Sequence, residues 1–270
     1  MSRRRLRAEH ATLVVVGGLL VGFLVVPLLA LFARTTALDF REGLRHPLVW
    51  PALRLSLLTT TVSSTFVVLL GAPLAWTLAR ARGRLARTIE TTVQLPIVIP
   101  PAVAGVAMLL AFGRRGVLAG WLYPAGWSVT FTTAAVVMAE VFVSAPFFVQ
   151  AATSAFRRID ANTLIVARSF GASPLRVFFR VALPMAAPGL VAGAAMSWAR
   201  ALGEFGATLM FAGNLPGRTQ TLPLAIYTAL ESDLRAAQAL SIVLVVVAFA
   251  LLLFVREVLR RSTERPEVPT

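Results

Sequence analysis

The chain has 270 residues, of which 57% are hydrophobic, and its mean hydropathy of +0.78 is far too high for a soluble domain. Its net charge is +14, and every basic side chain except the two histidines is arginine. The absence of cysteine excludes a disulfide framework, a thiolate metal site and a thiol nucleophile. The absence of lysine excludes a GxxxxGK phosphate-binding loop, so any ATP that drives this protein must bind to another polypeptide.

Six stretches are apolar and long enough to cross a bilayer, which requires ~20 residues per helix. The first follows the basic start MSRRRLRAEH, and it is longer than the ~7–15 apolar residues of a secretory signal, so we expect it to remain as a span. The sequence predicts an all-α polytopic membrane protein with six transmembrane helices. The expected spans are Ala11–Ala33, Leu55–Ala79, Ile89–Phe112, Val129–Ala155, Met185–Ala212 and Ala236–Val255.

The arginines indicate how these spans are oriented. Of the 26 arginines, 17 lie in the N-terminal segment, the second and fourth loops and the tail, whereas 8 lie in the other three loops. Positive residues gather on the cytoplasmic side of membrane proteins. We therefore expect both termini in the cytoplasm, and external loops at 34–54, 113–128 and 213–235, the first of which can hold a short surface helix.

Two of the spans contain residues that are unusual in a lipid-facing helix. The third has Pro96, Pro100 and Pro101 within six residues, which predicts a broken or bent helix beside a cavity. The fifth contains Arg200 and Glu204 one helical turn apart, so the two side chains can pair. A charge at the middle of the membrane costs on the order of 3 kcal/mol, so both must face protein or water.

Two interpretations of this charged pair are open. It can be a buried ion pair that fixes helix register and also meets Glu140, which lies near the middle of the fourth span. Alternatively, this face lines a translocation pathway, in which Arg200 offers positive potential to an anion and Glu204 holds Arg200 in place. Gly203 and Gly206 bracket the glutamate and allow another backbone to approach closely.

The stretch 161–184 is too polar and too short to cross a bilayer, and it is expected to form two short helices around a turn. Gly171 can end the first helix in a left-handed conformation, and Ser173 followed by Pro174 can open the second. Candidate caps of the first helix are Asp160, Asn162 and Thr163. The second helix should carry Arg176 and Arg180 on one face and, on the other, Leu175, Phe178, Phe179 and Ala182. By periodicity alone, this is an interfacial loop on a membrane surface.

The spacing of Ala167, Gly171, Leu183 and Pro184 resembles the cytoplasmic signature loop of binding-protein-dependent ABC importer permeases, with Val181 replacing the usual Ile. The match is partial, because Ile165-Val166 stands where the family has Glu-Ala. The resemblance implies that 161–184 is a coupling loop that docks into the ATP-hydrolysing subunit through shape, its apolar face and its arginines. The coupling residues it implies are Ala167, Arg168, Gly171, Ala172, Ser173, Pro174, Leu175, Phe178, Leu183 and Pro184.

Two further stretches, 94–105 (QLPIVIPPAVAG) and 199–227 (ARALGEFGATLMFAGNLPGRTQTLPLAIY), are similar to the permeases of molybdate and tungstate importers. The resemblance extends over about 51–255 and implies a type I ABC importer permease fold. It divides the chain into a segment 1–50 with the first span, a five-helix permease core 51–255 and a cytoplasmic tail 256–270. The translocation residues that we assign on this basis are Glu140, Arg200, Glu204 and Gly206.

The same resemblance implies partners. It predicts a homodimer in the bacterial inner membrane, joined to two ATPase subunits that bind ATP and Mg²⁺ and supplied with oxyanion by an external binding protein. It predicts no catalytic residue, metal or cofactor on this chain.

Other functions remain open from the sequence. A sulfate or thiosulfate permease would carry similar motifs, and the motifs do not separate molybdate from tungstate. An ion-coupled secondary transporter could use Glu140 and Glu204 as proton carriers. A gated channel would conduct much faster than an ATPase cycle. A membrane enzyme is disfavoured because His10 and His46 lie outside the spans and no HExxH or GxSxG motif is present.

Overall fold

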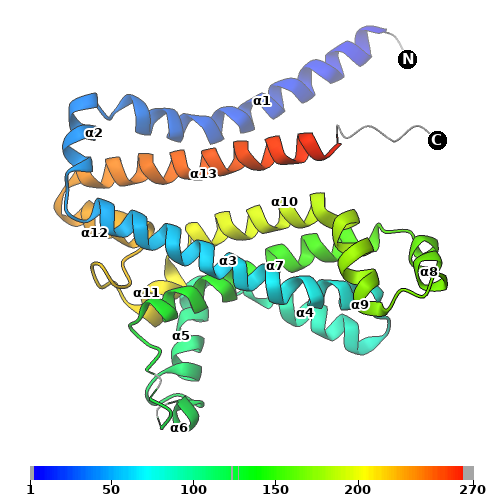
Figure 1. The fold of residues 1–270 in the computed structure, drawn as a ribbon. Coiled ribbons are helices and arrows are strands. Elements are labelled where there is room, and N and C mark those ends of the chain that lie inside the picture. Colours follow the sequence, from blue (N-terminus) through cyan, green and yellow to red (C-terminus); the bar gives the residue numbers. More distant parts are fainter. Residues whose placement is uncertain (1–2, 123, 127, 264–270) are drawn as a thin grey trace.

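The computed structural model describes residues 3–122, 124–126 and 128–263, and every regular element in this part of the chain is helical (Figure 1). Five helices are long and apolar enough to cross a membrane, and a bent pair forms a sixth candidate span. The predicted class and number of spans are thus confirmed. The long helices are α1 (Arg3–Ala33), α3 (Val49–Arg80), α7 (Thr133–Arg157), α10 (Leu183–Leu202) and α13 (Leu234–Thr263).

The third predicted span is the bent pair. It consists of helix α4 (Arg84–Val98) and helix α5 (Pro101–Phe112), and the chain bends by 115° between them. The bend follows from Pro100 and Pro101, which cannot donate backbone hydrogen bonds and disfavour a helical conformation in the residue before them. Ile99 accordingly has an extended backbone, with ψ of 128°. Pro96, by contrast, lies inside α4 without ending it. In Figure 1, α4 runs alongside α7, whereas α5 turns away from the direction of α4 and leads from α11 (Gly206–Ala212) toward α6 (Ala119–Leu122).

The fifth predicted span differs from the structure at both ends. It begins earlier, because α9 (Pro174–Val177), the π-helical turn η1 (Phe178–Ala182) and α10 continue one another without a break. Pro184 would crowd the carbonyl of Arg180 in a regular helix, and the wider π-turn directly before it relieves that contact. The span also stops earlier, at Leu202, and a separate helix α11 (Gly206–Ala212) follows.

The loops expected outside the membrane contain helices. Helix α2 (Ala37–Leu44) is the short surface helix expected in 34–54, and a single turn, α6 (Ala119–Leu122), lies in 113–128. The segment 213–235 between the fifth and sixth spans also contains a helix that the sequence did not predict, α12 (Leu222–Ser232), which occupies half of it. Pro223 suits the first turn of this helix, and three of its buried residues pack in a cluster with α13 and α3: Leu222, Ala225 and Ala229.

Helix α7 is the centre of the fold and packs along α3 on one side and α10 on the other (Figure 1). Small residues allow these approaches. A Cβ at Gly189 or Gly193 of α10 would lie 2.5 Å from the Cβ of Ala155 or 2.9 Å from that of Ala151, both on α7. A Cβ at Gly71 of α3 would meet the ring of Phe148 at 2.8 Å. The core therefore depends on backbones in close contact, as is usual where lipid surrounds the bundle.

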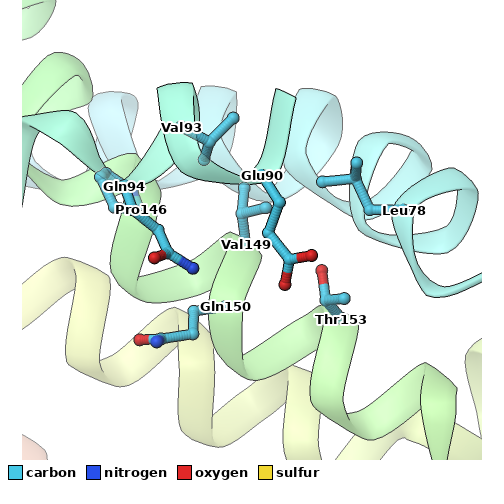
Figure 2. Close-up of a pocket in the computed structure, with 8 residues that line it drawn as sticks. All are labelled: Leu78, Glu90, Val93, Gln94, Pro146, Val149, Gln150 and Thr153. Atoms are coloured by element: carbon cyan, nitrogen blue, oxygen red, sulfur yellow. The ribbon is translucent and has the colours of Figure 1, made fainter. Parts of the chain in front are cut away.

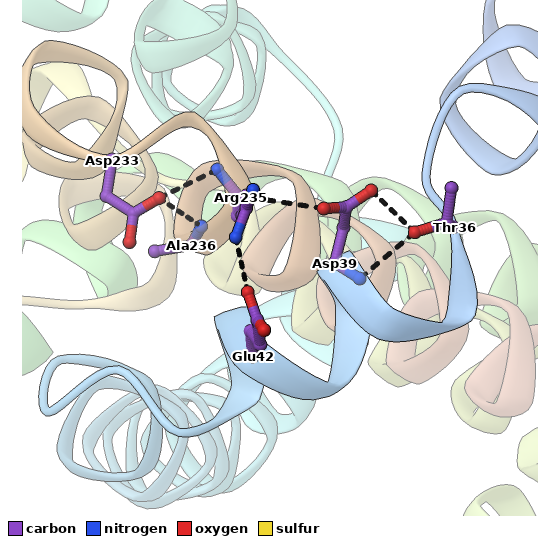
Figure 3. Close-up of polar contacts among 6 residues, drawn as sticks. All are labelled: Thr36, Asp39, Glu42, Asp233, Arg235 and Ala236. Carbon is purple, nitrogen blue, oxygen red and sulfur yellow. Dashed lines mark hydrogen bonds and ion pairs between the residues drawn. The ribbon is translucent and has the colours of Figure 1, made fainter.

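A polar clamp joins α2 to the start of α13 (Figure 3). Arg235 pairs with Asp39, at 3.1 Å, and with Glu42. The hydroxyl of Thr36 donates a hydrogen bond to Asp39. This hydrogen bond and the charge of Arg235 lower the pKa of the Asp39 carboxyl, so its ion pair with Arg235 is lost only when the pH falls below the usual range of an aspartate. The clamp keeps the α1–α2 corner against α13, while the apolar surface of α1 is exposed over most of its length.

The described ends of the chain lie together. The first turn of α1 and the last turn of α13 are at the same end of the bundle as α8 (Ala161–Ser169), and α2 and α12 are at the other end (Figure 1). The tail predicted at 256–270 lies partly outside the described residues, and as far as Thr263 it continues α13.

We predict that Gly189→Leu will destabilise the protein, because the new side chain would overlap Ala155 in the α7–α10 contact. Overpacking of this kind costs typically about 1–3 kcal/mol. Gly18→Leu on α1 is the matched control, since a Cβ there meets no atom within 4 Å. Thermal unfolding in detergent should show a lower midpoint for Gly189→Leu than for the parent protein, and an unchanged midpoint for Gly18→Leu. Equal midpoints for the two variants would contradict the packing described.

Candidate functional site

The loop predicted from spacing has the expected local geometry. Asp160 caps α8 by accepting a hydrogen bond from the backbone N–H of Asn162, at 3.0 Å. Gly171 ends that helix in the left-handed region, with φ of +80°. Ser173 is the N-cap of α9, and Pro174 is its first residue, as predicted. The turn therefore holds α8 at a defined angle to the helix that leads back into the membrane.

An exposed apolar surface lies on α8 and the turn after it. Ile165 and Val166 are 59% and 54% exposed, and Phe170 is 87% exposed. Leu175 on α9 is also exposed, while the alanines at 167 and 172 are half-buried. We call these four large side chains the α8 surface. Together with exposed Arg168, they make an apolar area with a basic edge at the end of the bundle.

The apolar face predicted for the second helix is wrong in part. Instead of sharing one surface, these residues divide: Phe178 and Ala182 are buried in the core, whereas Leu175 and Phe179 are exposed. Val177, which the prediction left out, is fully buried. The buried side of this segment is centred on Val177 and Phe178, so Leu175 and Phe179, one turn apart, lie away from the core. A substitution of Phe178 therefore tests folding rather than docking.

Aromatic packing anchors this segment to the core. The ring of Phe178 lies 5.5 Å from that of Trp76 on α3 and 6.1 Å from that of Phe156 on α7. The guanidinium of Arg80 lies 3.2 Å from the centre of the Trp76 ring, a cation–π contact. Leu183 is half-buried at the start of α10, and Pro184 is exposed. Phe178 thus ties the segment after the Gly171 turn to α3 and α7 through buried rings.

The second candidate site lies at the break between α10 and α11. Arg200 and Glu204 pair as predicted, with Nη2 2.7 Å from Oε2. Glu204 also has a role that helix spacing did not predict, because its Oε1 accepts a hydrogen bond from the backbone N–H of Ala207, at 2.7 Å, in the first turn of α11. The glutamate therefore satisfies one of the backbone donors that the break leaves open. Its side chain is 1% exposed, whereas that of Arg200 is 26% exposed.

Glu140 does not join this ion pair. Its Oε1 accepts a hydrogen bond from Thr59 Oγ1 of α3, at 2.7 Å, and no arginine in the described residues pairs with it. Thr59 and Ser56 were not predicted as site residues. The only sequence feature that pointed to them was the abundance of Thr and Ser in the second span. Ser56 Oγ accepts a hydrogen bond from the backbone N–H of Leu222, at 2.7 Å.

Glycines bring α5 against α11 beside this pair. A Cβ at Gly206 would lie 3.0 Å from the Cβ of Pro101, and one at Gly105 would lie 2.7 Å from the carbonyl oxygen of Ala207. The close approach predicted for Gly206 is confirmed. The structure thus brings Arg200, Glu204 and Gly206 together, and the coupling residues of 161–184 lie at a separate site. Among the described residues, no group of three or more potential metal-binding side chains is present.

We predict that the charge swap Arg200→Glu/Glu204→Arg will be less stable than the parent protein, although the two charges can still pair. An arginine at 204 cannot accept the Ala207 N–H, so a buried donor would lose its partner, at a cost of about 1–3 kcal/mol. The thermal midpoint of the swap should therefore remain near that of Glu204→Ala. A midpoint like that of the parent protein would show that only the charge pairing matters.

The sequence of this chain is similar to known transport proteins. Residues 67–265 match the family model "Binding-protein-dependent transport system inner membrane component". The molybdenum transport system permease protein ModB of Mycobacterium tuberculosis is 47% identical over 226 residues, which cover 84% of this chain and 86% of that protein. The molybdate/tungstate transport system permease protein WtpB of Pyrococcus abyssi is 33% identical, with 89% of this chain and 91% of that protein covered.

Solved structures share the fold at lower identity. A bacterial ABC transporter that imports the acidic polysaccharide alginate matches with a TM-score of 0.77 at 18% identity, covering 96% of each chain. An inward-facing structure of the MetNI methionine ABC transporter matches with a TM-score of 0.64 at 22% identity, covering 80% of this chain and 96% of that one. These matches confirm the predicted permease fold. The chain therefore belongs to the family of inner membrane components of binding-protein-dependent transport systems.

Proposed function

We propose that this protein is the permease subunit of an ATP-driven importer for molybdate or tungstate. The observation that carries this proposal is the extended similarity to the ModB and WtpB permeases, which covers more than four-fifths of this chain. In the proposed complex, two copies of the chain form the pathway, two ATPase subunits bind it from the cytoplasm, and an external protein delivers the oxyanion. The chain itself is then a transport component without a catalytic residue.

The α8 surface is the proposed docking site for the ATPase subunit. It is apolar, exposed and held at a fixed angle by Gly171 and Ser173. The segment that follows the α8 surface is anchored to α3 and α7 by the ring of Phe178. Motion of the ATPase at α8 can therefore move these two helices. Because Ile165 and Val166 stand where the family loop has Glu and Ala, the contact rests on apolar packing and arginines.

Arg200 is the proposed anion-facing residue of the pathway. Its guanidinium has five N–H donors, and the buried Glu204 carboxylate binds it from one side only. The other side is partly exposed, so it can offer positive potential to a doubly charged oxyanion. Glu140 is the proposed second polar residue of the pathway, held by Thr59. Gly206 contributes by allowing α5 to lie close to the pair.

The proposed orientation places both termini and α8 in the cytoplasm. Two observations support it: the arginine-rich loops share that side, and the described ends of α1 and α13 lie at the α8 end of the bundle. ATP and Mg²⁺ are assigned to the partner subunits, because this sequence contains no lysine for a phosphate-binding loop. We propose no resident cofactor for this chain.

We predict that Phe170→Asp will abolish binding of the ATPase subunit, because it places a charge in the exposed apolar contact. The matched control is Val117→Asp, a substitution of an equally exposed apolar residue, 85% exposed, in the loop between α5 and α6. Co-purification of the two subunits from detergent measures the effect. If Phe170→Asp retains the ATPase as well as the control does, α8 is not the docking site.

We predict that vesicles containing the permease, the ATPase and the binding protein will accumulate molybdate and tungstate only with ATP. An excess of unlabelled sulfate should leave labelled molybdate uptake unchanged. Equal competition by sulfate would identify a sulfate permease of the same family. Uptake that persists without the ATPase would identify an ion-coupled transporter instead.

A further inference from the structure

Helix α4 is held to the bundle by few contacts. None of its 15 residues is buried, and the helix that it packs against is α7. Among the described residues, α4 forms side-chain hydrogen bonds to another helix through one pair of residues, Glu90 and Arg157. Arg157 donates from Nη1 and Nη2 to the two carboxylate oxygens of Glu90, at 3.2 and 3.0 Å. This two-pronged geometry fixes direction as well as distance.

The pair lies next to the coupling loop. Arg157 is the last residue of α7, and Asp160, which caps α8, follows three positions later. A small cavity of about 10 Å³ lies between α4 and α7 here, and its polar lining residues are Glu90, Gln94, Gln150 and Thr153. Figure 2 shows Glu90 of α4 and Thr153 of α7 directed into it. Any shift of the end of α7 therefore acts directly on Glu90.

The other arm of the bent unit is fixed to the pathway. Helix α5 packs on α11 through Gly105 and Gly206, with contacts too close to admit a side chain. The first turn of α11 binds Glu204. Between the two arms, Pro100 and Pro101 fix their own φ angles and restrict the residue before each of them, so the bend is stiff.

We propose that the bent α4–α5 unit is a lever, and that Glu90 and Arg157 are positioning residues that transmit motion of the coupling loop to the pathway. This inference rests on the proposed function, since an ATPase must move α8. Both side chains are partly exposed, 32% for Glu90 and 47% for Arg157, and exposed pairs contribute little to stability. Loss of the pair should therefore change coupling while the fold persists.

The experiment uses the complex of permease and ATPase with spin labels at Leu69→Cys on α3 and Val103→Cys on α5, both exposed positions in a chain without native cysteine. In the otherwise unchanged protein, a non-hydrolysable ATP analogue should shift the distance between the labels. Glu90→Gln should abolish that shift and reduce uptake per ATP hydrolysed by about tenfold. The double substitution Glu90→Arg/Arg157→Glu should restore both.

Glu42→Gln is the matched control, because it removes the carboxylate partner of an arginine at the opposite end of the bundle, where Glu42 is 56% exposed. It should leave both the nucleotide-dependent shift and the uptake unchanged. A full shift in Glu90→Gln, or no shift in the parent complex, would overturn the lever. Failure of the ATPase to co-purify with the parent protein would overturn the proposed function, and the lever with it.

Discussion

The break between α10 and α11 depends on one carboxylate. Inside a membrane, an interrupted helix leaves backbone donors that water cannot satisfy. Glu204 replaces one of the lost partners by accepting the N–H of Ala207, and Arg200 neutralises the charge that this glutamate brings. The pair is therefore structural and also places a partly exposed cation at the break. The two interpretations that the sequence left open are compatible, because the same contact that fixes the helix end directs Arg200 outward.

The helices around this break are arranged so that movement at one end can reach it. Helix α7 connects the α8 end of the bundle to the level of Glu140, and it packs tightly against α3 and α10. Tightly packed helices shift as rigid bodies rather than deforming. The bent α4–α5 unit gives a second connection, outside the core. In the complex proposed above, the ATPase acts at α8, and these connections would carry its motion to the break.

Much of this architecture could be predicted from the sequence. Hydropathy predicted six apolar spans, the prolines at 100 and 101 predicted the bend at Ile99, and Gly171 with Ser173 predicted the turn between α8 and α9. These features are local, since each depends on residues that are neighbours in the chain. The i,i+4 spacing of Arg200 and Glu204 gave their pairing for the same reason.

The errors concern features that local patterns do not contain. Burial of Val177 with Phe178 left Leu175 and Phe179 outside the core, and the fifth span breaks after Leu202, where hydropathy alone continued it. The contacts of Glu140 with Thr59 and of Glu90 with Arg157 join residues 81 and 67 positions apart, so tertiary packing decides them.

The most direct test of the central claim, that the ATPase acts on this protein through α8, is site-specific crosslinking. The chain has no cysteine, so Val166→Cys on α8 provides a single reactive position. The account predicts an efficient crosslink from this position to the ATPase, which changes with bound nucleotide, and none from Val117→Cys. No crosslink at Val166→Cys, with oxyanion uptake indifferent to nucleotide, would contradict it.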